Sequence, residues 1–308
     1  MKANTELAIA TIKQKSPVEA ARTEVIPQPT DVPLISVNST STQVNVIRWR
    51  GSVLTDATDK VVEEVPVAMV YNGISHVVML ATPADLDDFA LGFSLSEGIF
   101  RDKSDLYSVD IVAQEQGIEL QMDVATQCFV QLKERRRNLT GRTGCGLCGA
   151  ESLDQVLRLP AQSINQTTFK IPASSIEQAF KTVQLHQPLQ QATGATHACA
   201  WVSMQGEIQL VREDVGRHNA MDKLIGGLAN LSETAKTPSQ NEGFVLTSSR
   251  ASVEMVQKVA TAGISVLAAI SAPTGLAIRV AETYGVTLIG FLRDNQFVIY
   301  THKHRIQF

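Results

Sequence analysis

The sequence predicts an α/β fold in which a smaller α+β unit precedes a larger C-terminal α/β layer. From about residue 216 to residue 292, apolar strands alternate with helices, a rhythm typical of βαβ units and of a largely parallel sheet covered on both faces. Before this region, paired strands with short turns surround a helix. With 308 residues, of which 44% are hydrophobic, the chain is long enough for two packed units.

Composition argues against several classes of protein. The net charge of −4 is opposite to the basic excess of a general nucleic-acid binder. No apolar run approaches the ~18 residues of a transmembrane helix, and residues 1–30 lack the apolar block of a secretory signal. Four cysteines in so long a chain do not make a disulfide framework. We therefore expect a cytoplasmic protein with neither a nucleic-acid nor a membrane partner.

The N-terminal part divides into a leader and a domain. Residues 1–42 are polar and contain prolines, and we expect them to be a disordered leader. Residues 43–134 are expected to form an N-terminal α+β domain. Its predicted strands lie at about 44–49, 65–71, 74–80, 107–114, 117–124 and 127–132. Asn72-Gly73 suits the tight primed turn of a hairpin between the second and third of these strands.

One helix is predicted inside this N-terminal domain. Thr82-Pro83 opens it, because proline is tolerated at an early helical position, and Gly98 marks its end. Three early aspartates complement the N-terminal dipole of the helix. They are Asp85, Asp87 and Asp88.

A glycine-rich segment with two thiols, residues 135–150, is expected to form a flexible loop. Cys145 and Cys148 make a Cys-x-x-Cys pair, and the glycines around them leave the backbone conformationally free. The preceding cations are Lys133, Arg135, Arg136, Arg137 and Arg142. Nearby cations favour the thiolate, which is the nucleophile. The residues therefore predict an activated sulfur, and they leave metal binding, disulfide exchange and sulfur transfer open.

Residues 151–308 are expected to form the C-terminal α/β domain. Its predicted helices lie at about 150–157, 172–185, 216–231, 252–262 and 275–284. Its predicted strands lie at about 196–203, 207–212, 243–248, 264–270, 286–292 and 297–302. The first two strands are expected to form a hairpin and the next three a parallel series. The last strand is expected to pair antiparallel with its neighbour.

Polar side chains follow the three parallel strands of this predicted sheet. Ligands of open α/β sheets bind beyond the carboxyl ends of the strands, where helix N-termini present free N–H groups. The first turn carries Ser248, Ser249 and Arg250, whose guanidinium could bind a phosphate, and the second carries Thr274. The third segment, whose amide and carboxylate groups could recognise a purine, consists of Phe291, Leu292, Arg293, Asp294, Asn295 and Gln296. Helix capping by the hydroxyl groups is the alternative for any one turn alone.

A further polar segment, Gly216-Arg217-His218-Asn219, places a cation, an imidazole and an amide in one turn at a helix N-terminus. We expect Arg217 and His218 to take part in the same site. The neighbouring charged residues are expected to be cap and surface charges; they are Glu213, Asp214 and Lys223. His197 and Cys199 face the same side of a strand, and their expected role is structural.

The motifs do not favour a metal. A zinc deaminase carries His-x-Glu followed by Pro-Cys-x-x-Cys, but Gly144 precedes the thiol pair here and no such His-x-Glu lies upstream. A structural zinc site needs four ligands, and Cys128 would supply only a third beside Cys145 and Cys148. A thioredoxin-type disulfide exchanger is also not favoured, because its thiols start a helix directly after a strand in a smaller domain. A zinc site stays open as an alternative.

Four segments in order carry a family resemblance. They are residues 82–93, the Cys145-Gly146-Leu147-Cys148-Gly149 loop, residues 212–219 and Thr247-Ser248-Ser249-Arg250. Together they resemble the FdhD family of formate dehydrogenase accessory sulfurtransferases, from about Val44 to His302. The resemblance implies a C-terminal domain with the cytidine-deaminase-like three-layer α/β fold, without the deaminase zinc site, and a homodimer.

The resemblance also implies a function. Family members accept sulfane sulfur from a cysteine desulfurase as a cysteine persulfide. They pass it to the molybdenum bis(molybdopterin guanine dinucleotide) cofactor before its insertion into formate dehydrogenase, the client enzyme. Cys145 matches the persulfide-bearing cysteine of the family, Cys148 its partner, and residues 291–296 the cofactor-binding segment. A guanine nucleotide such as GDP would occupy the same site. A non-catalytic cofactor chaperone and a zinc-stabilised nucleotide-binding module stay open as alternatives.

Overall fold

The computed structural model of the protein describes residues 39–137, 169–231 and 242–308. The first two strands, β1 (Ser41–Arg50) and β2 (Val53–Val62), pair antiparallel across Gly51-Ser52, where both residues have positive φ angles. β1 confirms the strand expected near 44–49, whereas the sequence pattern does not predict β2. Its residues are almost all exposed, so it lacks the apolar alternation by which a half-buried strand is recognised.

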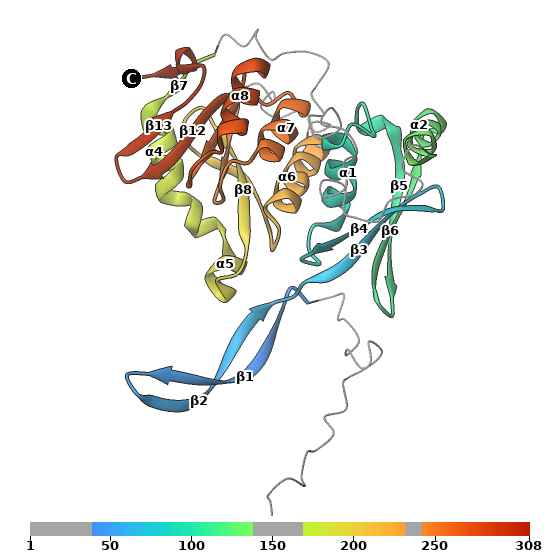
Figure 1. The fold of residues 1–308 in the computed structure, drawn as a ribbon, viewed down its shortest axis with the longest axis horizontal. Helices are drawn as coiled ribbons and strands as arrows, with labels where there is room; N and C mark the ends of the chain where they lie inside the picture. Colours follow the sequence, from blue (N-terminus) through green and yellow to red (C-terminus); the bar gives the residue numbers. More distant parts are fainter. Residues whose placement is uncertain (1–38, 138–168, 232–241) are drawn as a thin grey trace, which may run out of the picture. The chain divides into compact units, whose positions relative to one another are not determined.

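A four-stranded sheet follows, with the strand order β4-β3-β6-β5 (Figure 1). Its strands are β3 (Val65–Tyr71), β4 (Ile74–Ala81), β5 (Leu106–Gln114) and β6 (Gly117–Val124). β3 and β6 run parallel, and the other neighbours run antiparallel. Asn72 and Gly73 have φ angles of 44° and 78°, which confirms the predicted tight turn between β3 and β4.

The strand predicted at 127–132 is wrong, because this segment lies in helix α2 (Thr126–Arg137). Cys128 and Leu132 stand four residues apart, and both are buried in the core of the four-stranded sheet, whereas Val130 is exposed. That spacing places the two buried residues on one face of a helix. The apolar composition of residues 127–132 is compatible with a strand, but the packing of one helix face, that of Cys128 and Leu132, against the sheet decides the structure.

Helix α1 (Leu86–Ser96) begins later than the predicted start at Thr82-Pro83. The backbone N–H of Thr82 donates to Asp214 Oδ2 at 3.0 Å, and its carbonyl oxygen accepts from Lys223 Nζ at 2.8 Å. Thr82 is therefore held by the C-terminal half of the chain rather than by a helical turn. Two aspartates of the first turn lie as expected: Asp87 and Asp88.

The C-terminal region forms a six-stranded sheet with the order β13-β12-β11-β10-β8-β9. Its strands are β8 (His197–Ser203), β9 (Ile208–Asp214), β10 (Gly243–Thr247), β11 (Val266–Ala269), β12 (Thr287–Arg293) and β13 (Gln296–Ile299). β10, β11 and β12 are parallel. β8 pairs antiparallel with β9 and β10, and β13 pairs antiparallel with β12. The predicted hairpin, parallel series and closing strand are thus confirmed.

Helices cover both faces of this sheet, so the region has three layers (Figure 1). The helices are α4 (Ala173–Val183), α5 (Pro188–Thr193), α6 (Arg217–Leu231), α7 (Val253–Thr261) and α8 (Gly275–Tyr284). α6, α7 and α8 share an apolar core with one face, and α4 packs on the other. The predicted α/β class is confirmed. No helix in the described part of the chain is long and apolar enough to cross a membrane.

Helix α1 crosses α6 with their backbones in close contact. A Cβ atom at Gly92 would fall on the backbone carbonyl of Asp222, and a Cβ atom at Gly226 would fall on that of Asp88. Buried polar contacts lie beside this crossing: Asp222 Oδ1 accepts from Lys258 Nζ at 2.7 Å, and Asp88 Oδ2 accepts from Arg212 Nε at 2.8 Å. Glycine is required at the crossing because no side chain fits between the two helices.

Candidate functional site

The turns predicted to form a ligand site lie in one row at the edge of the six-stranded sheet. β10, β11 and β12 are parallel, so their carboxyl ends meet at the same edge. Backbone hydrogen bonds continue the row beyond the strands. Ser248 N donates to Ala198 O at 3.0 Å, Ser271 N to Ser249 O at 3.4 Å, and Phe291 N to Ser271 O at 3.3 Å. The predicted juxtaposition of the three segments is therefore observed.

Three helix N-termini face this same edge. α7 follows β10 and α8 follows β11, so both begin where their strands end. α6 begins here as well, because β9 runs antiparallel to β8 and ends at Asp214, opposite His197. Helix N-termini present backbone N–H groups and a positive dipole end, which together favour anionic ligand groups.

Several buried polar atoms at this edge have no hydrogen-bond partner among the described residues. They are Gln187 Nε2, Arg217 Nε, His218 Nε2 and Ser252 Oγ. A buried polar group without a partner costs about 1–3 kcal/mol, so native proteins keep few of them. They lie on the segments that begin α5, α6 and α7. Two of them, His218 Nε2 and Ser252 Oγ, interact with the Glu254 carboxylate, so Gln187 Nε2 and Arg217 Nε are the donors left for a ligand in the described part of the chain.

His218 has an acidic neighbour that the sequence did not single out. Its Nε2 lies 3.6 Å from Glu254 Oε2, in the first turn of α7, which is an ion-pair distance but longer than a good hydrogen bond. The interaction with His218 is the main cause that lowers the pKa of Glu254 from 4.5 to about 2, although burial opposes it. Glu254 therefore carries a negative charge that orients the imidazole.

The hydroxyl groups predicted to contact a ligand divide into different roles. Ser249 is buried, and its Oγ is hydrogen-bonded to Thr247 Oγ1 at 3.0 Å, so it stabilises the turn that follows β10. Thr274 Oγ1 accepts from Ala277 N at 3.3 Å and caps α8. Ser248 Oγ accepts from Ala198 N at 2.9 Å and lines a pocket, and Arg250 is exposed beside it in the sequence. The capping alternative thus describes Ser249 and Thr274, whereas Ser248 and Arg250 remain placed for a ligand.

The segment 291–296 consists of the end of β12, the two-residue turn Asp294-Asn295 and the first residue of β13. Phe291 has a φ of 55° and is 42% exposed, at an irregularity in the pairing of these two strands. An exposed aromatic residue in the left-handed region is uncommon. Arg293 Nη1 donates to Ile270 O at 2.7 Å, and Asn295 Oδ1 accepts from Lys181 at 3.5 Å. Leu292 is buried in the core, whereas Asp294 and Gln296 are exposed.

Two residues expected to be surface charges are instead fully buried. Asp214 and Lys223 form an ion pair at 2.7 Å, and both side chains are 0% exposed. The expectation is wrong because both side chains also bind the backbone of Thr82, which is distant in the sequence and lies on the segment that precedes α1. Glu213 does act as a cap, but for α5: its carboxylate accepts from the backbone N–H groups of Leu189 at 2.9 Å and Gln190 at 2.7 Å.

Of the four cysteines, two lie in the described residues. Cys199 is buried beside Thr247, and burial raises its pKa to about 12; burial also raises the pKa of Cys128. Neither thiol has the character of a reactive thiolate. Residues 135–137 of the expected loop belong to α2. Cys145 and Cys148, together with the helix predicted at about 150–157, lie outside the described residues.

Helix α5 and its neighbours are the part of the site that the sequence reasoning missed. Gln187, Gln190, Thr196 and His197 line a pocket with Ser248. A signal for α5 was present, because Pro188 stands at its first position and Gly194, with a φ of 69°, closes it. The helix is short, and its polar residues show no apolar periodicity.

The fold is that of an α/β protein with a candidate polar ligand site beyond the carboxyl ends of its parallel strands. The FdhD/NarQ family model matches residues 62–307. A sulfur carrier protein FdhD from Cupriavidus necator is 56% identical over 262 residues, which cover 85% of this chain and 88% of the relative. A protein of the same name from Bordetella petrii is 50% identical over 264 residues, or 85% of this chain and 92% of the relative. The chain belongs to the FdhD/NarQ family.

A solved structure shares the fold. It is described as a formate dehydrogenase accessory protein from Desulfotalea psychrophila, and it aligns with a TM-score of 0.65 over 87% of this chain and 100% of its own. The two sequences are 22% identical, so this likeness bears on the fold alone.

Proposed function

We propose that the protein is a sulfur carrier that accepts sulfane sulfur from a cysteine desulfurase as a persulfide on Cys145. The Cys145 thiolate attacks the outer sulfur of the desulfurase persulfide, the S–S bond breaks, and the desulfurase cysteine leaves as a thiolate. The Cys148 thiolate then attacks the inner sulfur on Cys145, so that a Cys145–Cys148 disulfide forms and the outer sulfur leaves as hydrosulfide. The hydrosulfide is delivered to molybdenum bis(molybdopterin guanine dinucleotide), a substrate destined for formate dehydrogenase, and a dithiol reductant regenerates the two thiols. The names of the relatives and the Cys145-Gly146-Leu147-Cys148 segment support this proposal.

The observation that carries the cofactor part of the proposal is the cluster of helix N-termini at the sheet edge, where Arg217 Nε has no hydrogen-bond partner among the described residues. A guanine dinucleotide brings negatively charged phosphates and polar heterocycles. The N-termini of α6, α7 and α8, with Arg217, His218 and Arg250, supply N–H groups and positive charge to the phosphates. Phe291 offers an exposed aromatic face on which a base can stack.

The test separates carrying sulfur from binding the cofactor. Cys145→Ala should bind the cofactor with wild-type affinity and fail to activate formate dehydrogenase. Arg217→Ala with Arg250→Ala should still accept sulfur from the desulfurase but bind the cofactor at least about tenfold more weakly, because charge-assisted hydrogen bonds are lost. Arg48→Ala, an exposed arginine on β1, is the control and should behave as wild type.

Two other outcomes would favour the alternatives. Activation of formate dehydrogenase by Cys145→Ala would make the protein a cofactor chaperone rather than a sulfur carrier. About one zinc ion per chain, bound by thiolates, would favour a zinc-stabilised nucleotide-binding module.

A further inference from the structure

An imidazole and a carboxylate face each other across the starts of two helices at the candidate site. His218 is the second residue of α6, and Glu254 is the second residue of α7. His218 Nε2 lies 3.6 Å from Glu254 Oε2, and the two side chains are 27% and 23% exposed. Contact with phosphates uses only the positive charge of His218 and leaves Glu254 without a task. A carboxylate beside an imidazole is also an arrangement that fixes the ring for proton transfer.

The Glu254 carboxylate is held at the first turn of its own helix. Its interaction with His218, followed by hydrogen bonds from Ser252 and from its own backbone N–H group, lowers the pKa of Glu254 to about 2 against the effect of burial. Glu254 therefore stays ionised from mildly acidic pH upward. It is a negative charge that can orient a neighbouring imidazole without taking its proton.

The contact with Glu254 leaves one ring nitrogen of His218 for a substrate. Nε2 is buried and lies toward Glu254, so the exposed part of the side chain is formed by other atoms. Nδ1 makes no hydrogen bond to a residue in the described part of the chain. In a protonated imidazole both nitrogens are donors. One of them can thus interact with the carboxylate while the other donates to a substrate atom.

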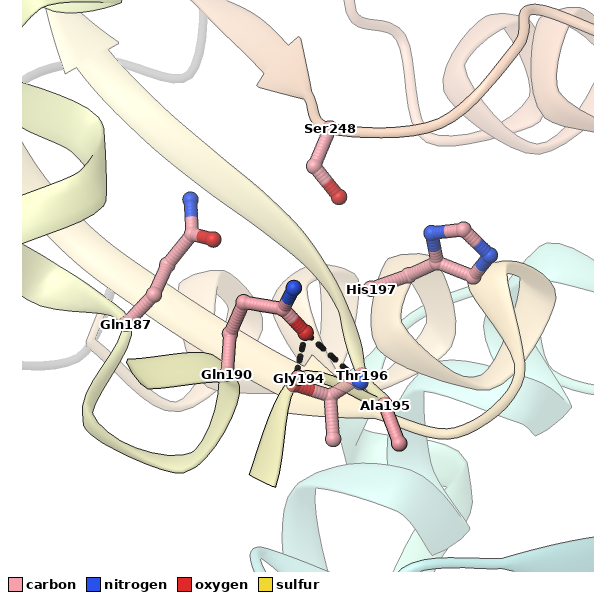
Figure 2. A pocket seen from close by; sticks show the side chains of 7 residues that line it. All are labelled: Gln187, Gln190, Gly194, Ala195, Thr196, His197 and Ser248. Atoms are coloured by element: carbon pink, nitrogen blue, oxygen red, sulfur yellow. Dashed lines mark hydrogen bonds between the residues drawn. The ribbon is translucent and has the colours of Figure 1, made fainter. Parts of the chain in front are cut away.

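The other charged groups near His218 come from its own helix and from two strands. Arg217 precedes it on α6, and His197 stands at the start of β8, where its ring borders a pocket (Figure 2). The pKa of His197 is lowered, first by burial and then by the charges of Arg217 and His218. Asp214, at the end of β9, acts on His197 and lies in a buried ion pair of its own. Among the described residues, Glu254 is therefore the carboxylate that forms an ion pair with His218.

The delivery of sulfur to the cofactor requires a proton. When the sulfur of hydrosulfide replaces an oxygen ligand of the molybdenum, that oxygen leaves as water and so needs two protons. The hydrosulfide brings one of them, and a general acid has to supply the other. One doubly charged ligand replaces another, so the metal keeps its oxidation state and the step needs neither an oxidant nor a reductant.

We propose that His218 is this general acid and that Glu254 positions it, with His218 Nδ1–H as the donor to the leaving oxygen. The Mo–S bond forms and the Mo–O bond breaks. The electron pair of the Nδ1–H bond stays on the imidazole, which then takes a new proton from solvent. This inference rests on the proposed function, because it assigns one step of the same sulfur transfer to residues of the candidate site.

The experiment follows a single turnover of the full-length protein. The protein is loaded by a cysteine desulfurase with radioactive sulfur and mixed with oxygen-ligated molybdenum bis(molybdopterin guanine dinucleotide). The label that enters the cofactor is measured against time, cofactor concentration and pH. The wild-type rate should fall as the pH rises, because the donor loses its proton. His218→Gln should be at least about 100-fold slower even at saturating cofactor, since general acids contribute about 10²–10⁴-fold.

Glu254→Gln tests the positioning role, because it keeps the shape of the side chain and removes its charge. The fall in rate should move to lower pH, since the protonated imidazole loses the charge that stabilises it. The rate at neutral pH should drop at least about tenfold. Glu254→Asp keeps the charge and should keep the wild-type pH profile. The matched control is Glu282→Gln, in the last turn of α8, where Glu282 lies 3.8 Å from His302; it should change neither the rate nor the profile.

The outcomes separate this inference from the proposed function. Sulfur loading of Cys145 equal to that of wild type shows that a variant is folded. A wild-type rate of His218→Gln at saturating cofactor would overturn the inference and leave His218 as a ligand of phosphates. A pH profile of Glu254→Gln that coincides with that of wild type would reject the positioning role. Wild-type protein that accepts sulfur but transfers none to the cofactor would reject the proposed function, and the inference with it.

Discussion

Buried polar residues near the start of α6 fall into two groups at the scale of single side chains. Asp214 is fully satisfied: its carboxylate accepts from Thr82 N, from Gly216 N at 2.8 Å, from Asn219 at 3.0 Å and from Lys223 at 2.7 Å. Among the described residues, the neighbouring Arg217 Nε has no hydrogen-bond partner, and His218 Nε2 has only the Glu254 carboxylate at 3.6 Å. The first group stabilises the fold, and the second is available for a ligand.

Removal of the buried cation should strongly destabilise the protein. In Lys223→Met the Asp214 carboxylate stays buried without its ion-pair partner, and we expect the free energy of unfolding to fall by about 3–5 kcal/mol, measured by urea denaturation. Lys60→Met, on the exposed strand β2, should change it by less than about 0.5 kcal/mol. Equal effects of the two substitutions would show that the buried pair does not stabilise the fold.

The pKa of Glu254 gives a pH-dependent prediction. Because its pKa of about 2 in the folded protein lies below the ordinary 4.5, the carboxylate contributes stability above about pH 4.5, and this stability is lost as the pH falls toward 2. His218→Phe should raise the pKa of Glu254 and flatten this loss, whereas His186→Phe, an exposed site, should not. Carboxyl titration by NMR, with acid unfolding, measures both effects. A Glu254 carboxyl that titrates near 4.5 in the wild type would refute the interaction.

At the scale of elements, the crossing of α1 and α6 joins the four-stranded sheet to the edge that carries the site. Gly92 and Gly226 allow the two backbones to touch. Ser96 on α1 donates to Asp222 on α6 at 2.5 Å, and Lys258 on α7 donates to the same carboxylate. The start of α6, and with it Arg217 and His218, is therefore positioned by an N-terminal helix.

A methyl group at this crossing should force the helices apart. In Gly92→Ala the new Cβ would lie 2.6 Å from Gly226 N, besides its overlap with Asp222, and we expect a loss of at least about 1–3 kcal/mol in thermal or urea unfolding. Gly275→Ala is the matched control, because a Cβ there would meet only Arg279 Nη1 at 3.6 Å. It should be neutral or stabilising by up to about 1 kcal/mol. A tolerated Gly92→Ala would mean that the crossing is not tight.

Local patterns in the sequence predict the elements well where one face is buried or a turn has strict requirements. The Asn72-Gly73 hairpin and the alternation of β10, β11 and β12 with α7 and α8 are of this kind. The wrong expectations for Asp214 and Lys223 and the missed role of Glu254 have a common cause, because the burial or role of each side chain depends on contacts with residues distant in the sequence. Asp214 and Thr82 are 132 residues apart in the sequence, so no local signal shows that Asp214 and Lys223 are buried. Glu254 likewise becomes part of the site only through its contact with His218.

The candidate site was predictable to a similar extent. Parallel strands bring their carboxyl ends together by topology, so the row of Ser248, Thr274 and Phe291 follows from the order of elements. Which hydroxyl group caps a helix and which faces a pocket depends on side-chain geometry. The position of α5 depends on Glu213 of β9, whose carboxylate accepts hydrogen bonds from the backbone N–H groups of Leu189 and Gln190. This contact between separate elements has no local signal in the sequence.

At the scale of the whole molecule, the proposed function requires both the Cys145 thiol and the sheet edge, to which separate parts of the chain contribute. The buried cysteines sharpen its test. Burial raises the pKa of both Cys128 and Cys199, so neither thiol should compete with Cys145 for sulfur. The full chain thus contains two internal controls for the chemistry of the Cys-x-x-Cys pair.

The most direct test of the central claim is peptide mapping by mass spectrometry after the full-length protein is incubated with a cysteine desulfurase and cysteine. The predicted result is one additional sulfur atom on the peptide that contains Cys145, none on Cys128 or Cys199, and none anywhere in Cys145→Ser. An additional sulfur found on neither Cys145 nor Cys148 would contradict the account.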